Sequence, residues 1–219
     1  MRKLTVYSEI AFFLGMTLLS IGVNFMIKSD FGISPVQSSA YVLYTVFPKI
    51  TFGTYNYLIQ FVLVSILCII VKRIRLRYFL SFLSAVFYGF TVDYFTFIML
   101  PLTAEGMAMR ILFYVIGFVC IVFAITFFFR TNIPLMPYDI FVTDLAKHKS
   151  FNKNTVKIIF DVSSLVAGMV HSFAFHQKLV GIGIGTIISG LFSGISIKYM
   201  GKLMDKFIVF KPIFKKLEY

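Results

Sequence analysis

SEIAFFLGMTLLSIGVNFMIKSDFGISPVQ (residues 8–37) and RILFYVIGFVCIVFAITFFFRTNIPLMPYD (residues 110–139) decide the fold, because they follow one plan about 102 residues apart. Each is an apolar segment of helix length that ends in a cation and is followed by a proline. The positions that recur are Gly15/Gly117, Phe25/Phe127, Lys28/Arg130, Pro35/Pro137 and Gln37/Asp139. Two related halves of this size often enclose a substrate site between them in membrane transporters.

The correspondence continues along both halves with small shifts of register. Later pairs are Thr54/Thr155, Gln60/Asp161, Ser84/Ser189, Phe87/Phe192, Gly89/Gly194, Asp93/Lys198 and Tyr94/Tyr199. Repeat 1 therefore covers approximately residues 8–100 and repeat 2 approximately residues 108–204, within a single transmembrane domain over residues 1–219.

The composition predicts an integral membrane protein. Hydrophobic residues make up 59% of the 219 residues, charged residues only 14%, and the mean hydropathy is +0.90. Such a chain has too little polar surface for water and must face lipid over most of its area. The first apolar segment is not followed by a signal-peptide cleavage pattern, so we expect it to be retained.

Six segments are long enough to cross a hydrocarbon core of ~30 Å as helices. They cover approximately residues 8–28, 53–71, 78–100, 108–129, 155–175 and 184–204. Two shorter pieces, Pro35–Phe47 and Pro137–Lys147, each begin at a proline, which suits the first turn of a new helix. We expect an all-α fold of six spans with two half-helices, either re-entrant or at the interface.

The distribution of cations predicts the topology, because Lys and Arg near helix ends resist translocation. If both termini are cytoplasmic, 17 of the 21 Lys and Arg residues lie inside, and the four outside are Lys28, Lys49, Arg110 and Lys178. Three spans per half then place the two repeats upside down relative to one another.

The same distribution explains the net charge of +12 without a nucleic-acid partner. Residues 205–219 form a basic cytoplasmic tail. We expect this tail to be solvated, with binding of anionic headgroups as the alternative.

Three of the carboxylates within or beside the predicted helices, where charge is costly and is often functional, stand out in the repeat. In the repeat frame Asp139 corresponds to Gln37, Asp161 to Gln60, and Asp93 to Lys198. Each pair sets a carboxylate in one half against a neutral or cationic group in the other, as an ion- or proton-coupled site requires. These residues are candidates for contact with a substrate or a coupling ion.

Each candidate also has a structural interpretation. Asp139 suits a helix cap after Pro137, Asp93 is compatible with the wet outer interface, and Asp161 is spaced for an i, i+4 ion pair with Lys157. The positive ends of the half-helices that begin at Pro35 and Pro137 suit an anionic group, with Arg130 nearby. Arg130 is equally an ordinary flanking cation at the end of a span.

No catalytic, metal-binding or cofactor-binding pattern is present in the sequence. Cys68 and Cys120 do not correspond in the repeat, and they suggest neither a disulfide nor a metal site. The glycines of residues 181–185 lack the strand that a nucleotide loop requires, and we expect them to serve close helix packing. We therefore expect no enzyme and no cofactor.

Three segments carry a family resemblance. FGISPVQ (31–37), MPYD (136–139) and VGIGIGTIISGLFSG (180–194) resemble the YczE/YyaS/YitT family of bacterial integral membrane proteins, and the likeness covers nearly the whole chain. Val36 and Pro134 depart from that family, which usually has tryptophan and glycine there. The resemblance implies a six-span protein of the bacterial cell membrane with a poorly defined, transport-related role.

Three functions remain open at this point. The first is a secondary transporter of a small molecule, whose substrate site lies between the inverted halves. The second is a substrate-binding component that needs a partner in a larger transport complex, and the third is a non-transporting accessory or regulatory protein. Apart from the lipid bilayer, the expected partners are an unknown small molecule and either a second copy of the chain or a transport complex.

Overall fold

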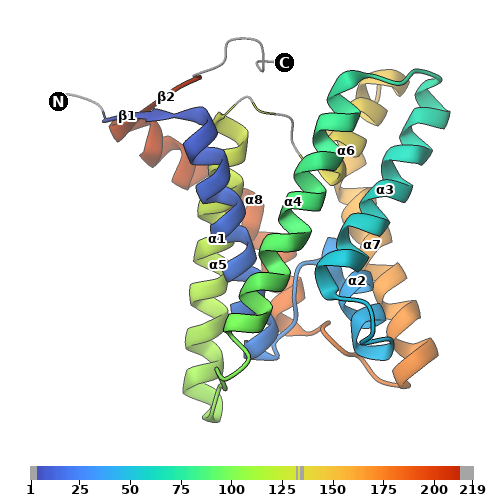
Figure 1. The fold of residues 1–219 in the computed structure, drawn as a ribbon, viewed down its shortest axis with the longest axis vertical. Coiled ribbons are helices and arrows are strands. Elements are labelled where there is room, and N and C mark those ends of the chain that lie inside the picture. The colour runs from blue at the N-terminus through green and yellow to red at the C-terminus, as the bar shows by residue number, and fades with distance from the viewer. Residues whose placement is uncertain (1–3, 132, 134–135, 213–219) are drawn as a thin grey trace.

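The computed structural model describes residues 4–131, 133 and 136–212, which are almost entirely helical (Figure 1). The helices are α1 (Ser8–Ser29), α2 (Pro35–Val46), α3 (Phe52–Val71), α4 (Leu76–Ile98), α5 (Gly106–Arg130), α6 (Pro137–Lys149), α7 (Lys153–His176) and α8 (Ile184–Phe207). Two short strands, β1 (Leu4–Tyr7) and β2 (Ile208–Lys211), flank them. Pro134, one of the departures from the resembled family, lies outside the described residues.

Within the described ranges, α1, α3, α4, α5 and α7 are long and apolar enough to cross a membrane. These helices differ widely in burial. Of the 18-residue apolar stretch that qualifies each helix, 56% is buried in α1 and only 11% in α7. α1 is therefore a central helix, and α7 presents most of its apolar surface outward. α8 has 24 residues but is not among the five candidates, since glycines, serines and Lys198 dilute its apolar residues. Its role as a sixth span stays a prediction.

The two short helices begin at the expected prolines. α2 has 12 residues and α6 has 13, and each carries its proline in the first helical turn. At 1.5 Å per residue neither is long enough to cross a hydrocarbon core of ~30 Å. A proline here costs no helical hydrogen bond, because the first N–H groups of a helix have no partner within it.

The two ends of the described chain form a short parallel ribbon, which corrects the expectation of a free tail from residue 205. α8 continues to Phe207, and β2 then pairs with β1, with Leu4 opposite Ile208. The sequence Ile208–Phe210 is β-branched and aromatic and favours a strand. Phe210 also packs edge-on against Phe127 of α5. Residues 213–219 of the predicted tail lie outside the described residues.

The helices form two groups that α4 connects. α1 packs on α5, and α5 on α8, whereas α2, α3, α6 and α7 pack on one another. α4 contacts α1 from the first group and α3 and α6 from the second. Figure 1 shows α1 and α5 on the left, the second group on the right, and α4 between them.

The contact between α1 and α5 depends on glycines at corresponding positions of the repeat. A Cβ on Gly117 would lie 2.6 Å from the carbonyl oxygen of Gly22, and a Cβ on Gly15 would lie 2.7 Å from the Phe128 ring and 3.3 Å from the carbonyl oxygen of Ala124. Gly15 and Ala124 are the repeat counterparts of Gly117 and Gly22. The two helices therefore make reciprocal contacts about their crossing point.

Most other helix contacts also occur as corresponding pairs. α2 packs on α7 as α3 packs on α6, and α1 packs on α4 as α5 packs on α8. Two pairs are exceptions within the described chain: α3 packs on α4, and α4 on α6, whereas their counterparts α7 and α8, and α8 and α2, make no comparable contact. The seam between α3 and α4 is very close, since a Cβ on Gly53 would lie 2.0 Å from the carbonyl oxygen of Gly89.

Candidate functional site

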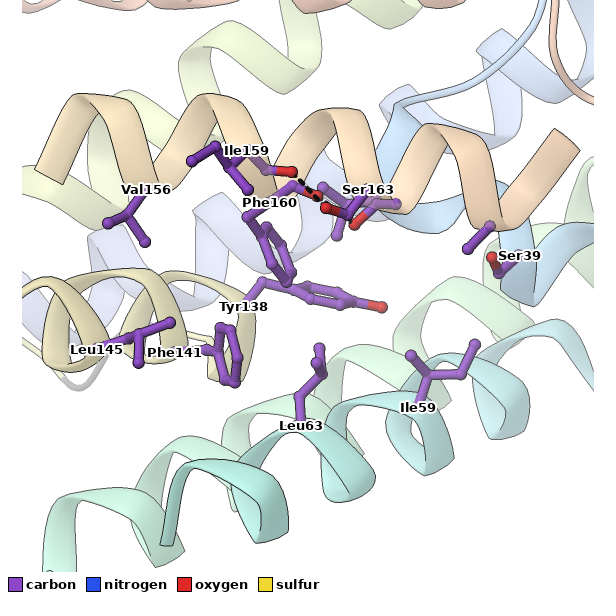
Figure 2. A pocket seen from close by; sticks show the side chains of 13 residues that line it. Ser39, Ile59, Leu63, Tyr138, Phe141, Leu145, Val156, Ile159, Phe160 and Ser163 are labelled. Atoms are coloured by element: carbon purple, nitrogen blue, oxygen red, sulfur yellow. Dashed lines mark hydrogen bonds between the residues drawn. The ribbon is translucent and has the colours of Figure 1, made fainter. Parts of the chain in front are cut away.

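A cavity of about 400 Å³ lies among α2, α3, α6 and α7 (Figure 2). It is lined by Val36, Ser39, Ile59, Leu63, Tyr138, Phe141, Leu145, Val156, Ile159, Phe160, Ser163, Ser164 and Ala167. Since α2 and α3 come from the first half of the chain and α6 and α7 from the second, the cavity lies where the two halves meet.

Both half-helices begin at this cavity. Val36 and Ser39 belong to the start of α2, and Tyr138 and Phe141 to the start of α6. The N-terminus of a helix carries free N–H groups and a partial positive charge of roughly half a unit. Asp139 lies in the first turn of α6 and compensates that end, whereas the first turn of α2 contains no acidic residue.

Tyr138 supplies the one buried polar side chain of the lining that has no partner among the described residues. Its side chain is 8% exposed, and Figure 2 shows its hydroxyl pointing into the cavity. Burial raises the pKa of this hydroxyl above its usual value, so the group is a neutral donor. The ring centroids of Tyr138 and Phe160 are 6.2 Å apart, and those of Phe160 and Phe141 are 5.5 Å apart. The three rings together form an aromatic wall of the cavity.

Buried amide side chains lie on both α2 and α3. Gln37 donates a hydrogen bond from Nε2 to the Tyr88 hydroxyl at 2.8 Å, while its Oε1 has no partner in the described chain. Gln60 is fully buried, and neither its Nε2 nor its Oε1 finds a described partner. One turn earlier on α3, Asn56 has an unpaired Oδ1. A buried polar group without a hydrogen bond costs ~1–3 kcal/mol. None of these three amides lines the cavity.

Asp139 and Asp161 both lie near Lys157, outside the lining of the cavity. Lys157 Nζ is 2.9 Å from Asp161 Oδ1, so the expected i, i+4 ion pair forms. Burial raises the pKa of the Asp139 carboxyl, while the ammonium groups of Lys157 and Lys153 lower it in part and Asp161 raises it. The structure therefore brings two of the sequence candidates to one cation beside the cavity.

Asp93 lies apart from the cavity and binds the N-terminus of α3. Its carboxylate accepts hydrogen bonds from the Gly53 N–H at 2.7 Å and from the Thr51 hydroxyl at 2.6 Å. Thr51 itself caps α3 by accepting a hydrogen bond from the Thr54 N–H at 3.2 Å. Asp93 therefore joins α4 to the start of α3 at the glycine seam.

Arg130 is also distant from the cavity lining. Its guanidinium donates two hydrogen bonds to Asp205 of α8, at 2.7 and 2.8 Å. Lys28, its repeat counterpart, donates to the carbonyl oxygen of Leu100 at 3.1 Å, just beyond the end of α4. In both halves the terminal cation thus ties the first span to the end of the last one.

Two glycine-containing segments of the family resemblance lie side by side. Ile33 donates its N–H to the carbonyl oxygen of Gly181 at 3.0 Å, and Gly185 donates to that of Phe31 at 2.8 Å. Gly32 and Gly181 have φ of 104° and 68°, in the region that favours glycine. The glycines at 181 and 183 therefore allow two loops to approach closely. The expected use in helix packing applies to Gly185 of α8, where a Cβ would lie 2.4 Å from the Tyr114 ring of α5.

Sequence reasoning missed Asp144, which is buried at the other end of α6. Its carboxylate accepts hydrogen bonds from Arg77 and from the Tyr78 hydroxyl, the latter at 2.6 Å. Arg75 lies 3.7 Å away. The cluster fixes α6 to the start of α4. The signal available in the sequence was the run of cations before α4, which the topology argument assigned only to the cytoplasmic side.

The family model described as "Family of unknown function (DUF6198)" matches residues 6–202. The chain belongs to DUF6198. This match covers every helix from α1 to α7 and most of α8, so the cavity and the loops around it are part of the DUF6198 region. Comparisons of this DUF6198 chain with curated proteins and with solved structures found no match.

Proposed function

We propose that this DUF6198 protein is a secondary transporter of a small molecule, with its substrate site in the cavity between α2, α3, α6 and α7. The two halves are inverted repeats with six spans, including α8. Both termini lie in the cytoplasm, and the protein resides in a bacterial cell membrane, as the resemblance to the YczE/YyaS/YitT family implies. Access to the site alternates between the two faces of the membrane.

The observation that carries this proposal is the reciprocal packing of the two halves. Gly15 and Gly117 contact corresponding positions across the α1–α5 crossing, and the half-helices each pack on a span of the other half. Alternating access in inverted repeats requires two halves that can exchange conformations around a site between them. The cavity lies at this junction.

The difference between the halves supports the same function. α3 and α4 are closed on one another, whereas α7 and α8 make no comparable contact in the described residues. In the proposed topology the start of α7 is cytoplasmic, so this conformation is closed at the outer face and open towards the cytoplasm. Exchange of the two arrangements reverses the access.

Asp139, Lys157 and Asp161 are the proposed coupling groups. They lie next to the cavity and not in its lining, so a proton or cation binding there changes the charge beside the site without occupying it. Carboxylates at membrane depth that pair with a cation are typical of proton relays in transporters.

Accessibility of one cavity residue from both sides of the membrane tests the proposal without knowledge of the substrate. In a chain with Cys68 and Cys120 replaced by alanine, Ser39→Cys is exposed to a membrane-impermeant methanethiosulfonate reagent in oriented vesicles. We expect modification from either side, and none for Val166→Cys, which lies on the exposed face of α7. Modification of Ser39→Cys from a single side, or from neither, contradicts alternating access.

A further inference from the structure

We propose that the cavity binds an uncharged aromatic molecule that presents a carbonyl-type hydrogen-bond acceptor to Tyr138. The inference deepens the proposed function by naming the class of substrate, and it rests on that function only for the claim that the bound molecule is transported.

The charge of the site excludes ions as its preferred ligands. None of the described lining residues is charged, and the cavity surface consists of aliphatic and aromatic side chains with three serines and Tyr138. Moving a full charge into such surroundings costs several kcal/mol unless an opposite charge meets it. Asp139 and Asp161 do not serve for this, because both lie beside Lys157 outside the lining.

Two of the three lining serines use their hydroxyl donors within their own helix, whereas Ser39, at the start of α2, makes no side-chain hydrogen bond with the described residues. Ser163 donates to the carbonyl oxygen of Ile159 at 2.6 Å, and Ser164 to that of Phe160 at 2.8 Å, within their own helix. The Tyr138 hydroxyl has no such partner among the described residues and points into the cavity (Figure 2). A ligand that reaches it therefore gains a hydrogen bond that the protein itself does not make.

The direction of this hydrogen bond is set by two features of the site. The Tyr138 hydroxyl is a neutral donor, and the start of α2, whose first turn has no acidic residue, contributes partial positive charge at the cavity. Both favour an oxygen acceptor over a donor. A partial charge of this size favours a carbonyl oxygen but does not replace the hydration of a full anion.

The shape of the site accounts for the aromatic part of the ligand. Tyr138, Phe141 and Phe160 form one wall, and ring pairs gain from offset or edge contacts. Ile59 and Leu63 of α3 face it across the cavity (Figure 2). A cavity of about 400 Å³ lies near the lower limit of small-molecule pockets, which suits one or two rings.

Nicotinamide, nicotinate and 1-methylnicotinamide test the class, because they share one ring and differ in charge. Binding to the full chain in detergent is measured by equilibrium dialysis and by thermal shift. We expect nicotinamide to bind at least tenfold more tightly than either ion, and Tyr138→Phe to weaken nicotinamide binding about tenfold, the upper range for a single neutral hydrogen bond. Tyr199→Phe, on the exposed face of α8, is the matched control and leaves the affinity unchanged.

Ala167→Phe is a second variant that fills the cavity without removing a polar group, and we expect it to abolish binding while the protein stays monodisperse. Equal or tighter binding of nicotinate, undiminished binding to both variants, or absence of nicotinamide binding overturns the proposal. The two assays separate failure of the proposed transport from failure of the proposed ligand class. If nicotinamide binds but Ser39→Cys is modified from one side only, transport is refuted and the ligand class stands. If Ser39→Cys is modified from both sides but an ion binds more tightly than nicotinamide, the ligand class is refuted and transport stands.

Discussion

Asp93→Asn is expected to loosen the seam between α3 and α4. The Asp93 carboxylate accepts hydrogen bonds from the Gly53 N–H and the Thr51 hydroxyl at the N-terminus of α3. A hydrogen bond to a charged group contributes ~1.5–3 kcal/mol, and the helix dipole adds roughly 0.3–1 kcal/mol. The asparagine amide keeps one acceptor oxygen and loses the charge. After allowance for the partial exposure of the site, we expect a loss of about 2 kcal/mol from the closed seam.

A loss of this size corresponds to a roughly thirtyfold increase in the ratio of open to closed seam. Tyr57→Cys is a suitable reporter, because Tyr57 of α3 lies at the seam: a Cβ on Gly89 of α4 would be 2.9 Å from its ring. With Cys68 and Cys120 replaced by alanine, the rate at which an impermeant maleimide labels this cysteine measures the open fraction. We expect the rate to rise at least tenfold in Asp93→Asn.

Asp30→Asn is the matched control for this experiment. Asp30 is also a carboxylate on the proposed outer side, but it is 82% exposed and paired with Arg110 away from the seam. We expect the labelling rate to stay within twofold of the parent. An unchanged rate in Asp93→Asn, or an equal rise in both variants, refutes the role of Asp93 in closing α3 on α4.

Three further predictions concern stability and coupling. Asp144→Asn leaves Arg77 beside a neutral amide at a site that is 5% exposed, and we expect the free energy of unfolding, measured with a chemical denaturant, to fall by ~2–4 kcal/mol. The control Asp205→Asn, at a 58% exposed site, lowers it by ~1 kcal/mol or less. Gly117→Val places a Cβ 2.6 Å from a backbone oxygen of α1, and we expect the melting temperature to fall by several degrees. In the control Gly194→Ala the new Cβ meets nothing within 4 Å, and the melting temperature stays unchanged or rises slightly. Asp161→Asn abolishes uptake by proteoliposomes while the melting temperature changes little, since the Lys157 pair is partly exposed; normal uptake removes Asp161 from coupling.

Hydrophobic length and proline positions made the helices predictable from the sequence. The expected starts of the half-helices at Pro35 and Pro137 agree with the structure, because a proline both ends one helix and suits the first turn of the next. The six long segments all form helices, with ends that differ by up to three residues where capping decides the boundary.

The parts that were missed depend on contacts between distant segments. β2 forms because its partner β1 lies about 200 residues earlier in the chain, and no local pattern joins the two. The buried position of Asp144 depends on how α6 meets the start of α4. The cavity could be placed between the halves in outline, but its lining could not, because single residues such as Tyr138 point inward only through the packing of four helices.

The asymmetry between the halves has a local origin in two corresponding pairs of residues. On α3 and α4 these are Gly53, which lets the backbones touch, and Asp93, which accepts from the N-terminus of α3. In the repeat frame their counterparts are Asn154 and Lys198. A residue with a Cβ at position 154 does not permit the close backbone approach that glycine permits, and a cation at position 198 does not accept hydrogen bonds from the N-terminus of α7 as a carboxylate does. The two halves therefore differ at this seam. Under the proposed function, a transporter must be able to leave its closed state, and unequal seams help to keep either conformation from being trapped.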